Sequence, residues 1–106
     1  MVKPYTLPQI ADILQGTLVQ DADPADIADL SIDSRKIAHP GQTLFLALKG
    51  TSLDGHSYIA ELTRKGVANF VISDKSAMLP NANFILVKDV RAALQKLAAY
   101  HRKQFA

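Results

Sequence analysis

The chain has 106 residues, a net charge of +2 at pH 7 and no cysteine, and 48% of its residues are hydrophobic. This length and composition fit one domain with a packed core. The lack of cysteine excludes disulfides, thiolate metal ligands and cysteine nucleophiles, and it fits a reducing cytosol. No apolar run approaches the ~18 residues of a membrane span, and the first residues lack the apolar core of a signal peptide. We therefore expect a cytoplasmic domain that does not enter a membrane.

The first predicted element is a short helix over residues 6–15. Thr6 can cap this helix, and Pro8 is tolerated in its first turn. One face carries apolar residues at helical spacing, namely Ile10, Ile13 and Leu14. We expect Gly16 to end the helix at the C′ position, where a left-handed backbone favours glycine.

Short apolar runs then predict one or two strands near the N-terminus. Residues 17–20 are a possible strand, and residues 21–26 form a polar loop that contains Pro24. The end of the run over residues 27–32 is predicted to be a strand that leads into a loop at Asp33.

The central part of the chain predicts a strand–helix–strand unit. Residues 43–48 are nearly all apolar, which predicts a strand covered on both faces. Residues 57–65 are predicted to be helical, with Glu61 and Lys65 as an i,i+4 pair and Gly66 as the stop.

Two more strands and a long helix complete the pattern. Residues 67–72 and 84–87 are predicted strands, separated by a loop with Pro80, and Asp89 is predicted to cap the last helix. The inner face of that helix is expected to carry Val90, Ala93, Leu94, Leu97, Ala98 and His101. The predicted fold class is α/β, a small open sheet with a βαβ core and helices on both faces.

Motifs for ATP and metal chemistry are missing from the sequence. It has no phosphate-binding glycine loop, no His-Glu-x-x-His and no Gly-x-Ser-x-Gly, and its three histidines lack ligand spacing. The cluster His101-Arg102-Lys103 favours a role as cations at a helix C-terminus over a nucleic-acid patch. We therefore expect no catalytic residue, no metal and no nucleic-acid partner for this segment.

Two polar loops are the candidates for ligand binding. Asp33-Ser34-Arg35 is by itself more typical of a strand-ending turn, although Ser34 and Arg35 suit a ligand with hydroxyls, carboxylates or phosphates. In the loop at residues 51–56, Asp54 is either a helix N-cap or part of an anion site. Parallel strands would place both loops at one carboxyl edge, where open α/β sheets bind ligands.

The combined pattern resembles the N-terminal domain of the Mur ligases, ATP-dependent enzymes that add amino acids to the peptidoglycan precursor. The resemblance depends on residues 32–35, Pro40-Gly41, residues 44–50, Asp54-Gly55-His56 and residues 66–72. It is strongest to the two later enzymes, which act on UDP-N-acetylmuramoyl-dipeptide and -tripeptide. The tail over residues 89–102 resembles the enzyme that adds D-alanyl-D-alanine, and most of all the form fused in some bacteria to an alanine racemase. The ligase that adds the third residue stays an alternative.

The resemblance implies that this segment holds the UDP part of the substrate. By position, Ser34 contacts the nucleotide, and residues 51–53 line the uracil and ribose–phosphate region. The other matching positions have roles that are either binding or structural. The implied UDP-binding set is Ile32, Asp33, Ser34, Arg35, Thr51, Ser52, Leu53, Asp54, Gly55 and His56.

The resemblance also implies partners and cofactors for a larger enzyme. The partner is UDP-N-acetylmuramoyl-peptide, and the domain is expected to pack against a central ATPase domain that is not in this sequence. This segment is expected to hold no cofactor, whereas the full ligase uses ATP and Mg²⁺, and a racemase fusion adds pyridoxal phosphate. The competing class is a non-catalytic module that binds a protein or nucleic acid through its basic tail.

Overall fold

A single twisted sheet forms the centre of the molecule. The structure is a computed structural model and describes residues 5–23, 26–33, 35, 37–48 and 55–105, with side chains up to residue 100. In this part of the chain the strand order is β1-β5-β4-β3-β2. The strands are β1 (Thr17–Gln20), β2 (Asp29–Ser31), β3 (Thr43–Leu46), β4 (Asn69–Ile72) and β5 (Asn83–Leu86). Strand β1 pairs antiparallel with β5, and the other neighbours are parallel.

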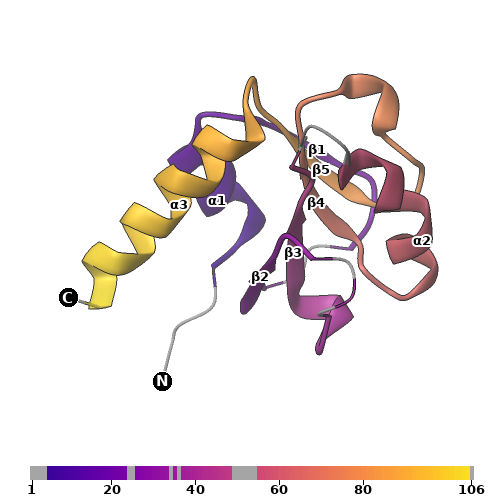
Figure 1. Cartoon of the computed structure of the whole chain (residues 1–106), viewed down its shortest axis with the longest axis horizontal. Helices are drawn as coiled ribbons and strands as arrows, with labels where there is room; N and C mark the ends of the chain where they lie inside the picture. The colour runs from indigo at the N-terminus through magenta and orange to yellow at the C-terminus, as the bar shows by residue number, and fades with distance from the viewer. Residues whose placement is uncertain (1–4, 24–25, 34, 36, 49–54, 106) are drawn as a thin grey trace.

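Helices cover both faces of this sheet (Figure 1). Helices α1 (Leu7–Leu14) and α3 (Val90–Phe105) lie side by side on one face, and α2 (Ile59–Arg64) lies on the other. The α/β class, with a βαβ core and helices on both faces, is therefore confirmed. In the described residues, no helix has the length and apolar character needed to cross a membrane.

The core is divided by the sheet into two layers. Along β3, Leu44 and Leu46 face the layer under α1 and α3, whereas Phe45 faces the layer under α2. The strands β4 and β5 alternate in the same way, because successive side chains of a strand point to opposite faces. This explains why β3, β4 and β5 are apolar after their first residue, since both faces of these central strands are buried.

Three phenylalanines form a row across the layer under α2. Phe45, Phe70 and Phe84 are register partners on neighbouring strands. The rings of Phe70 and Phe84 are stacked with centroids 5.4 Å apart, and those of Phe45 and Phe70 meet edge to face at 6.3 Å. Such pairs add to the burial energy, so this row helps to hold β3, β4 and β5 in register.

The predicted helix caps are present. The Thr6 side chain accepts a hydrogen bond from the Gln9 amide, and the Gln9 side chain accepts one from the Thr6 amide, which is a capping box. At α3, one carboxylate oxygen of Asp89 accepts hydrogen bonds from the amides of Arg91 and Ala92. Both helix starts were therefore readable from the sequence.

The predicted stop of α1 at Gly16 is wrong in its mechanism. The left-handed residue is Gln15, with φ 54°, and Gly16 does not have a positive φ. Gly16 is instead required for space, because a Cβ there would lie 2.7 Å from Ile85 Cγ2 and 2.9 Å from Val87 Cγ1. The glycine lets the chain turn tightly against the end of β5, and Gln15 takes the unfavourable backbone conformation.

The second helix is shorter than predicted. Residues 55–58 form a 3₁₀ turn, and α2 proper begins at Ile59. The Glu61–Lys65 pair is present at 3.2 Å, and Gly66 has the expected positive φ of 101°. Strands β2, β3 and β4 are shorter than the predicted runs, whereas β1 has the predicted bounds and β5 is shifted by one residue. Ile27, in the run before β2, makes an isolated bridge with Tyr5. Residues just outside a strand can be buried without making hydrogen bonds to the neighbouring strand. A run of apolar residues therefore overestimates the length of the strand.

A buried amide pair lies at the amino-terminal end of the parallel strands. Asn69 and Asn83 are register partners, and the Asn83 Nδ2 donates to Asn69 Oδ1 at 3.2 Å. The Asn83 Oδ1 also accepts hydrogen bonds from the amides of Asp21 and Ala22. Asn83 thus ties the segment after β1 to the sheet, and the Asn69 Nδ2 has no hydrogen-bond partner among the described residues.

Candidate functional site

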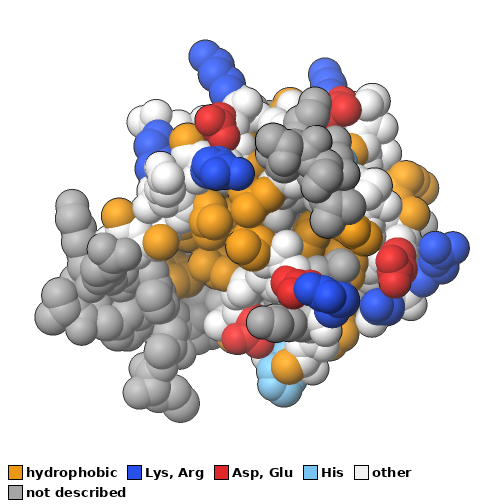
Figure 2. Space-filling view, viewed as in Figure 1, with side chains coloured by type: hydrophobic (Ala, Val, Ile, Leu, Met, Phe, Trp, Pro, Cys, Tyr) orange, Lys and Arg blue, Asp and Glu red, His pale blue; other side chains and the backbone are white. Residues whose placement is uncertain are grey.

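The carboxyl edge of the sheet carries a shallow pocket between the ends of β2 and β3. Its volume is about 580 Å³, and we call it the edge pocket. The described residues that line it are Ile32, Asp33, Arg35, Leu48, Gly55, Tyr58 and Glu61. Because β2 and β3 are parallel neighbours, the chain segments that follow them meet at this edge. Figure 2 shows hydrophobic side chains gathered on the face turned toward the viewer, with charged side chains around them.

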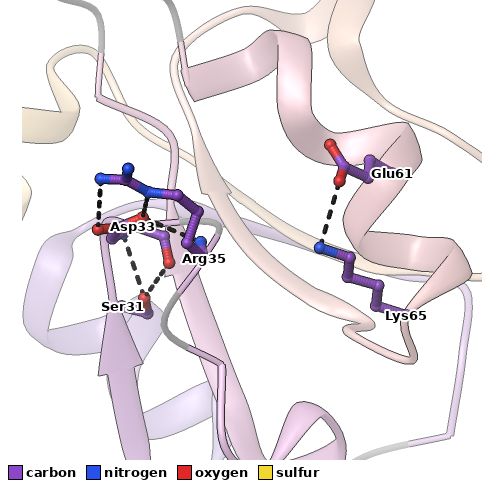
Figure 3. Close-up of polar contacts among 5 residues, drawn as sticks. All are labelled: Ser31, Asp33, Arg35, Glu61 and Lys65. Carbon is purple, nitrogen blue, oxygen red and sulfur yellow. Dashed lines mark hydrogen bonds and ion pairs between the residues drawn. The ribbon is translucent and has the colours of Figure 1, made fainter.

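The segment after β2 is held by a small hydrogen-bonded turn (Figure 3). The Ser31 hydroxyl donates to the Asp33 carbonyl oxygen at 2.9 Å and accepts from the Asp33 amide at 3.2 Å. The Asp33 carboxylate accepts the Arg35 amide at 2.9 Å, which is the short-range turn that aspartate favours. The turn reading of Asp33 is therefore confirmed, and the turn sets the position of Arg35.

The Arg35 guanidinium forms a two-point contact with the same carboxylate. Its Nε lies 3.2 Å from Asp33 Oδ1, and its Nη2 lies 3.3 Å from Asp33 Oδ2. The hydrogen bond with Asp33 is the main cause that raises the pKa of Arg35 above its ordinary value, and the charge of Asp33 adds to it. The Arg35 side chain is 87% exposed, so solvent screens this pair and its main effect is on geometry.

Gly55 closes the other side of the edge pocket. Its amide donates to the Leu48 carbonyl oxygen at 2.7 Å, which draws the start of the 3₁₀ turn back to the end of β3. A Cβ at this position would lie 2.8 Å from the Leu48 nitrogen and 2.9 Å from the Ala47 backbone. Only glycine permits this close approach of two backbone segments, which explains its place in the Asp-Gly-His motif.

His56 has a structural contact away from the edge pocket. Its Nε2 accepts a hydrogen bond from the Ser73 amide at 3.1 Å, just beyond the end of β4. The imidazole therefore joins the 3₁₀ turn before α2 to the exit of β4. This arrangement supports a positioning role for His56 at the same sheet edge.

The structure brings together part of the predicted site. Ile32, Asp33, Arg35 and Gly55 line the edge pocket, whereas His56 is not among the lining residues. The other predicted positions, Ser34, Thr51, Ser52, Leu53 and Asp54, lie outside the described residues. The assignment of any of these residues to UDP stays a prediction.

Sequence reasoning missed three residues that line the edge pocket, namely Leu48, Tyr58 and Glu61. Leu48 was assigned to the core strand, Tyr58 to an apolar helix stripe and Glu61 to a helix-surface ion pair. For Tyr58 and Glu61 the sequence did contain a signal. They lie three and six residues after Gly55, a spacing that places them on one face of a helix that begins there. The first turns of a helix that follows a binding loop face that loop.

Two other depressions share no lining residue with the edge pocket. One of about 300 Å³ lies between the end of α1 and the start of α3, and one of about 450 Å³ lies beyond β4 and β5. Neither contains a described residue of the predicted UDP set. Among the residues that the structure describes, no group of three or more histidine or acidic side chains could hold a metal ion.

Solved structures with the same fold cover nearly the whole chain. A UDP-N-acetylmuramoylalanyl-D-glutamyl-2,6-diaminopimelate–D-alanyl-D-alanyl ligase from Acinetobacter baumannii superposes with a TM-score of 0.84 at 30% identity, over 99% of this chain and 23% of that one. A crystal structure of MurF from the same organism gives a TM-score of 0.83 at 32% identity, over 97% of this chain and 22% of that one.

Curated relatives have the same two kinds of name. The UDP-N-acetylmuramoyl-tripeptide–D-alanyl-D-alanine ligase of Bacillus subtilis is 38% identical over 96 residues, which is 88% of this chain and 20% of the relative. The UDP-N-acetylmuramoyl-L-alanyl-D-glutamate–2,6-diaminopimelate ligase of Clostridioides difficile is 34% identical over 93 residues, 85% of this chain and 19% of the relative. The chain thus spans about a fifth of these relatives.

A family model provides the broadest match. The model described as "Mur ligase family, catalytic domain" matches residues 26–102, which include all four parallel strands and both candidate loops. This range is most of the chain, and it agrees with the fold and with the relatives. The resemblance seen in the sequence is confirmed, and the chain belongs to the Mur ligase family.

Proposed function

We propose that this chain binds the UDP part of UDP-N-acetylmuramoyl-peptide as the N-terminal domain of a larger peptidoglycan-precursor ligase. The observation that carries the proposal is the edge pocket, because residues from both predicted loops line it at the carboxyl edge of parallel strands. A pocket with apolar walls and a few charged groups suits a nucleotide. The names of the relatives support a UDP-linked substrate.

We further propose that the parent enzyme adds D-alanyl-D-alanine to the tripeptide precursor. The D-alanyl-D-alanyl ligase structures, which cover 97–99% of this chain, support this choice. The ligase that adds diaminopimelate is the second candidate, because its curated examples match at similar identity.

In this proposal the domain contributes substrate binding and no chemical step. ATP with Mg²⁺ would activate the precursor carboxylate in a central domain of the cytoplasmic parent enzyme, and the incoming amine would then attack it. An anchor on the nucleotide end binds the substrate and the transition state equally, so it lowers KM without raising kcat. The domain therefore acts by holding one end of a long substrate in place.

The test is an NMR titration of the isotope-labelled chain with UDP. We expect amide shifts in residues 32–35 and 50–58, and a dissociation constant between high micromolar and millimolar, about −4 to −6 kcal/mol. The binding is weak because the contacts of the other domains are missing while the entropy cost of association remains.

Two results would contradict the proposal. One is the absence of saturable shifts at millimolar UDP. The other is a response confined to residues 101–103 that appears with unrelated nucleic acid and weakens steeply as salt is raised. That pattern is the mark of counterion release, and it would favour a nucleic-acid interaction module.

A further inference from the structure

The 3₁₀ turn that leads into α2 is fastened to the ends of two neighbouring strands. We call this segment, Gly55–Tyr58, the pre-helix turn. The Gly55 amide donates to the Leu48 carbonyl oxygen at 2.7 Å, and the His56 Nε2 accepts from the Ser73 amide at 3.1 Å. Leu48 and Ser73 each lie two residues beyond a pair of register partners in β3 and β4. The pre-helix turn is therefore joined to the exits of both strands at the carboxyl edge of the sheet.

The contact with β4 fixes where the imidazole of His56 carries its proton. A backbone amide can only donate, so the Nε2 that accepts from Ser73 carries no hydrogen. In a neutral imidazole one nitrogen donates and the other accepts, so the proton then lies on Nδ1. An imidazolium would present an N–H group to the Ser73 amide and lose the hydrogen bond. The contact thus requires a side chain with an acceptor at the position of Nε2.

The pre-helix turn carries two residues of the edge pocket. Gly55 and Tyr58 line the pocket, whereas His56 is not among its described lining residues. Tyr58 is also the N-cap of α2, and within the described chain its side chain makes no capping hydrogen bond. The place of the turn therefore depends on contacts such as those of Gly55 and His56 with the sheet.

We infer that His56 is a positioning residue for the ligand that binds in the edge pocket. Its hydrogen bond to Ser73 holds the pre-helix turn against the end of β4, and this keeps Gly55 and Tyr58 in place in the pocket wall. Without the bond, the turn would have to be ordered when the ligand binds, and such ordering lowers affinity. This inference rests on the proposed function, and UDP is the ligand used to test it.

Matched variants test whether the acceptor on His56 is what binding requires. His56→Leu removes the acceptor but keeps an apolar side chain, and it should weaken UDP binding by roughly three- to tenfold. His56→Asn, whose shorter side chain does not reach as far, should cause a similar loss. His56→Gln offers an oxygen at about the reach of Nε2 and should stay within about twofold of the natural chain. Ser73→Ala keeps the amide donor, so this control should also stay within about twofold.

NMR of the chain without ligand tests the contact itself. The ring nitrogens of His56 should show an unprotonated Nε2 and a proton on Nδ1 wherever the ring is neutral. In His56→Leu the amides of Ser73 and of the pre-helix turn should exchange with solvent roughly three- to tenfold faster, because local opening becomes easier. In His56→Gln these amides should exchange at close to the natural rate.

The outcomes separate the inference from the proposed function. No saturable binding of UDP to the natural chain overturns both. Three results overturn the inference alone when the natural chain binds UDP: an unchanged UDP affinity in His56→Leu, an unchanged exchange rate of the Ser73 amide in that variant, or equal losses of affinity in His56→Leu and His56→Gln. A lower free energy of unfolding with unchanged UDP affinity shows that His56 only supports the fold, and it also overturns the inference. Urea unfolding shows whether each variant is folded, and His56→Asn replaces His56→Leu if that variant is not.

Discussion

At the scale of single residues, two serines that lie three positions apart in the sequence have different expected roles. Ser31 makes two hydrogen bonds to Asp33 at the end of β2, and both stabilise the turn. Ser34, three residues later, is the position that the family resemblance assigns to the nucleotide. Ser31 is therefore expected to act in folding and Ser34 in binding, and mutation can separate the two roles.

The prediction compares Ser31→Ala with Ser34→Ala. Ser31→Ala should lower the free energy of unfolding by about 0.5–1.5 kcal/mol for each hydrogen bond lost. Ser34→Ala should instead weaken UDP binding by up to about tenfold, because the loss of one hydrogen bond corresponds to a change of this size in the dissociation constant. It should have little effect on the free energy of unfolding. Urea denaturation and UDP titration of both variants measure the two effects. A stability loss without an affinity loss for Ser34→Ala would show that Ser34 only supports the turn.

A second residue-scale prediction concerns glycine. Gly16→Ala should destabilise the chain by about 1–3 kcal/mol, because its Cβ would lie within 3.0 Å of the Ile85 and Val87 side chains and of the β5 backbone. Gly41→Ala is the control, since its Cβ would meet nothing within 4 Å and its φ is not positive. The control should be neutral or more stable by up to about 1 kcal/mol. Equal thermal midpoints for the two variants would contradict the packing argument.

At the scale of elements, the buried Asn69–Asn83 pair connects strands to a loop. Asn83 joins β5 to β4 through Asn69 and to the segment after β1 through the amides of Asp21 and Ala22. Its Nδ2 also reaches the Asp23 carbonyl oxygen at 3.3 Å. Asn69 makes one of these bonds, and its Nδ2 has no partner in the part of the chain that the structure describes. Asn83 thus has more hydrogen-bond partners than Asn69, although the two side chains are chemically the same.

This asymmetry predicts unequal costs of truncation. Asn83→Ala leaves the amides of Asp21 and Ala22 without their acceptor and Asn69 Oδ1 without its donor. It should lower the free energy of unfolding by about 2–4 kcal/mol. Asn69→Ala removes an unpaired Nδ2 together with one hydrogen bond, and should cost at least ~1 kcal/mol less. Chemical denaturation at one pH measures both values. Equal losses would mean that side-chain volume, and not the hydrogen-bond network, decides the stability here.

At the scale of the whole molecule, the parallel strands of the sheet lead to one edge. The strands β2 to β5 are parallel, so their following segments meet at the carboxyl edge, and the edge pocket lies where β2 and β3 end. The Tyr5–Tyr100 contact, with ring centroids 6.1 Å apart, ties the first segment to α3 on one face. A support of this kind is compatible with the substrate-binding role proposed above.

The whole-molecule prediction is that this chain alone neither hydrolyses ATP nor forms a peptide bond. The reason is that its sequence contains no phosphate-binding glycine loop to hold the nucleoside triphosphate. Phosphate release from ATP, measured at several protein concentrations, should stay at the background rate. A rate that rises in proportion to the protein in independent preparations would refute the prediction.

Part of the candidate site could be predicted from the sequence. The turn residues at Asp33 and Arg35 and the glycine at position 55 were visible, because turn chemistry and close backbone approach are local requirements. Tyr58 and Glu61 were not, because their helical spacing equally fits a core stripe and a surface ion pair. Which helix face meets the edge pocket depends on how α2 packs on the sheet.

The sequence by itself determined the elements, both helix caps and the family, because hydrophobic periodicity, capping residues and motif spacing are local properties of the chain. Only the tertiary structure decided the strand order, the antiparallel pairing of β1 with β5, the hydrogen bonds of Asn83, and the left-handed backbone at Gln15. These features depend on contacts between residues far apart in the chain. Hydrophobic periodicity indicates that a side chain is buried, whereas the residues that it packs against are decided only by the tertiary structure.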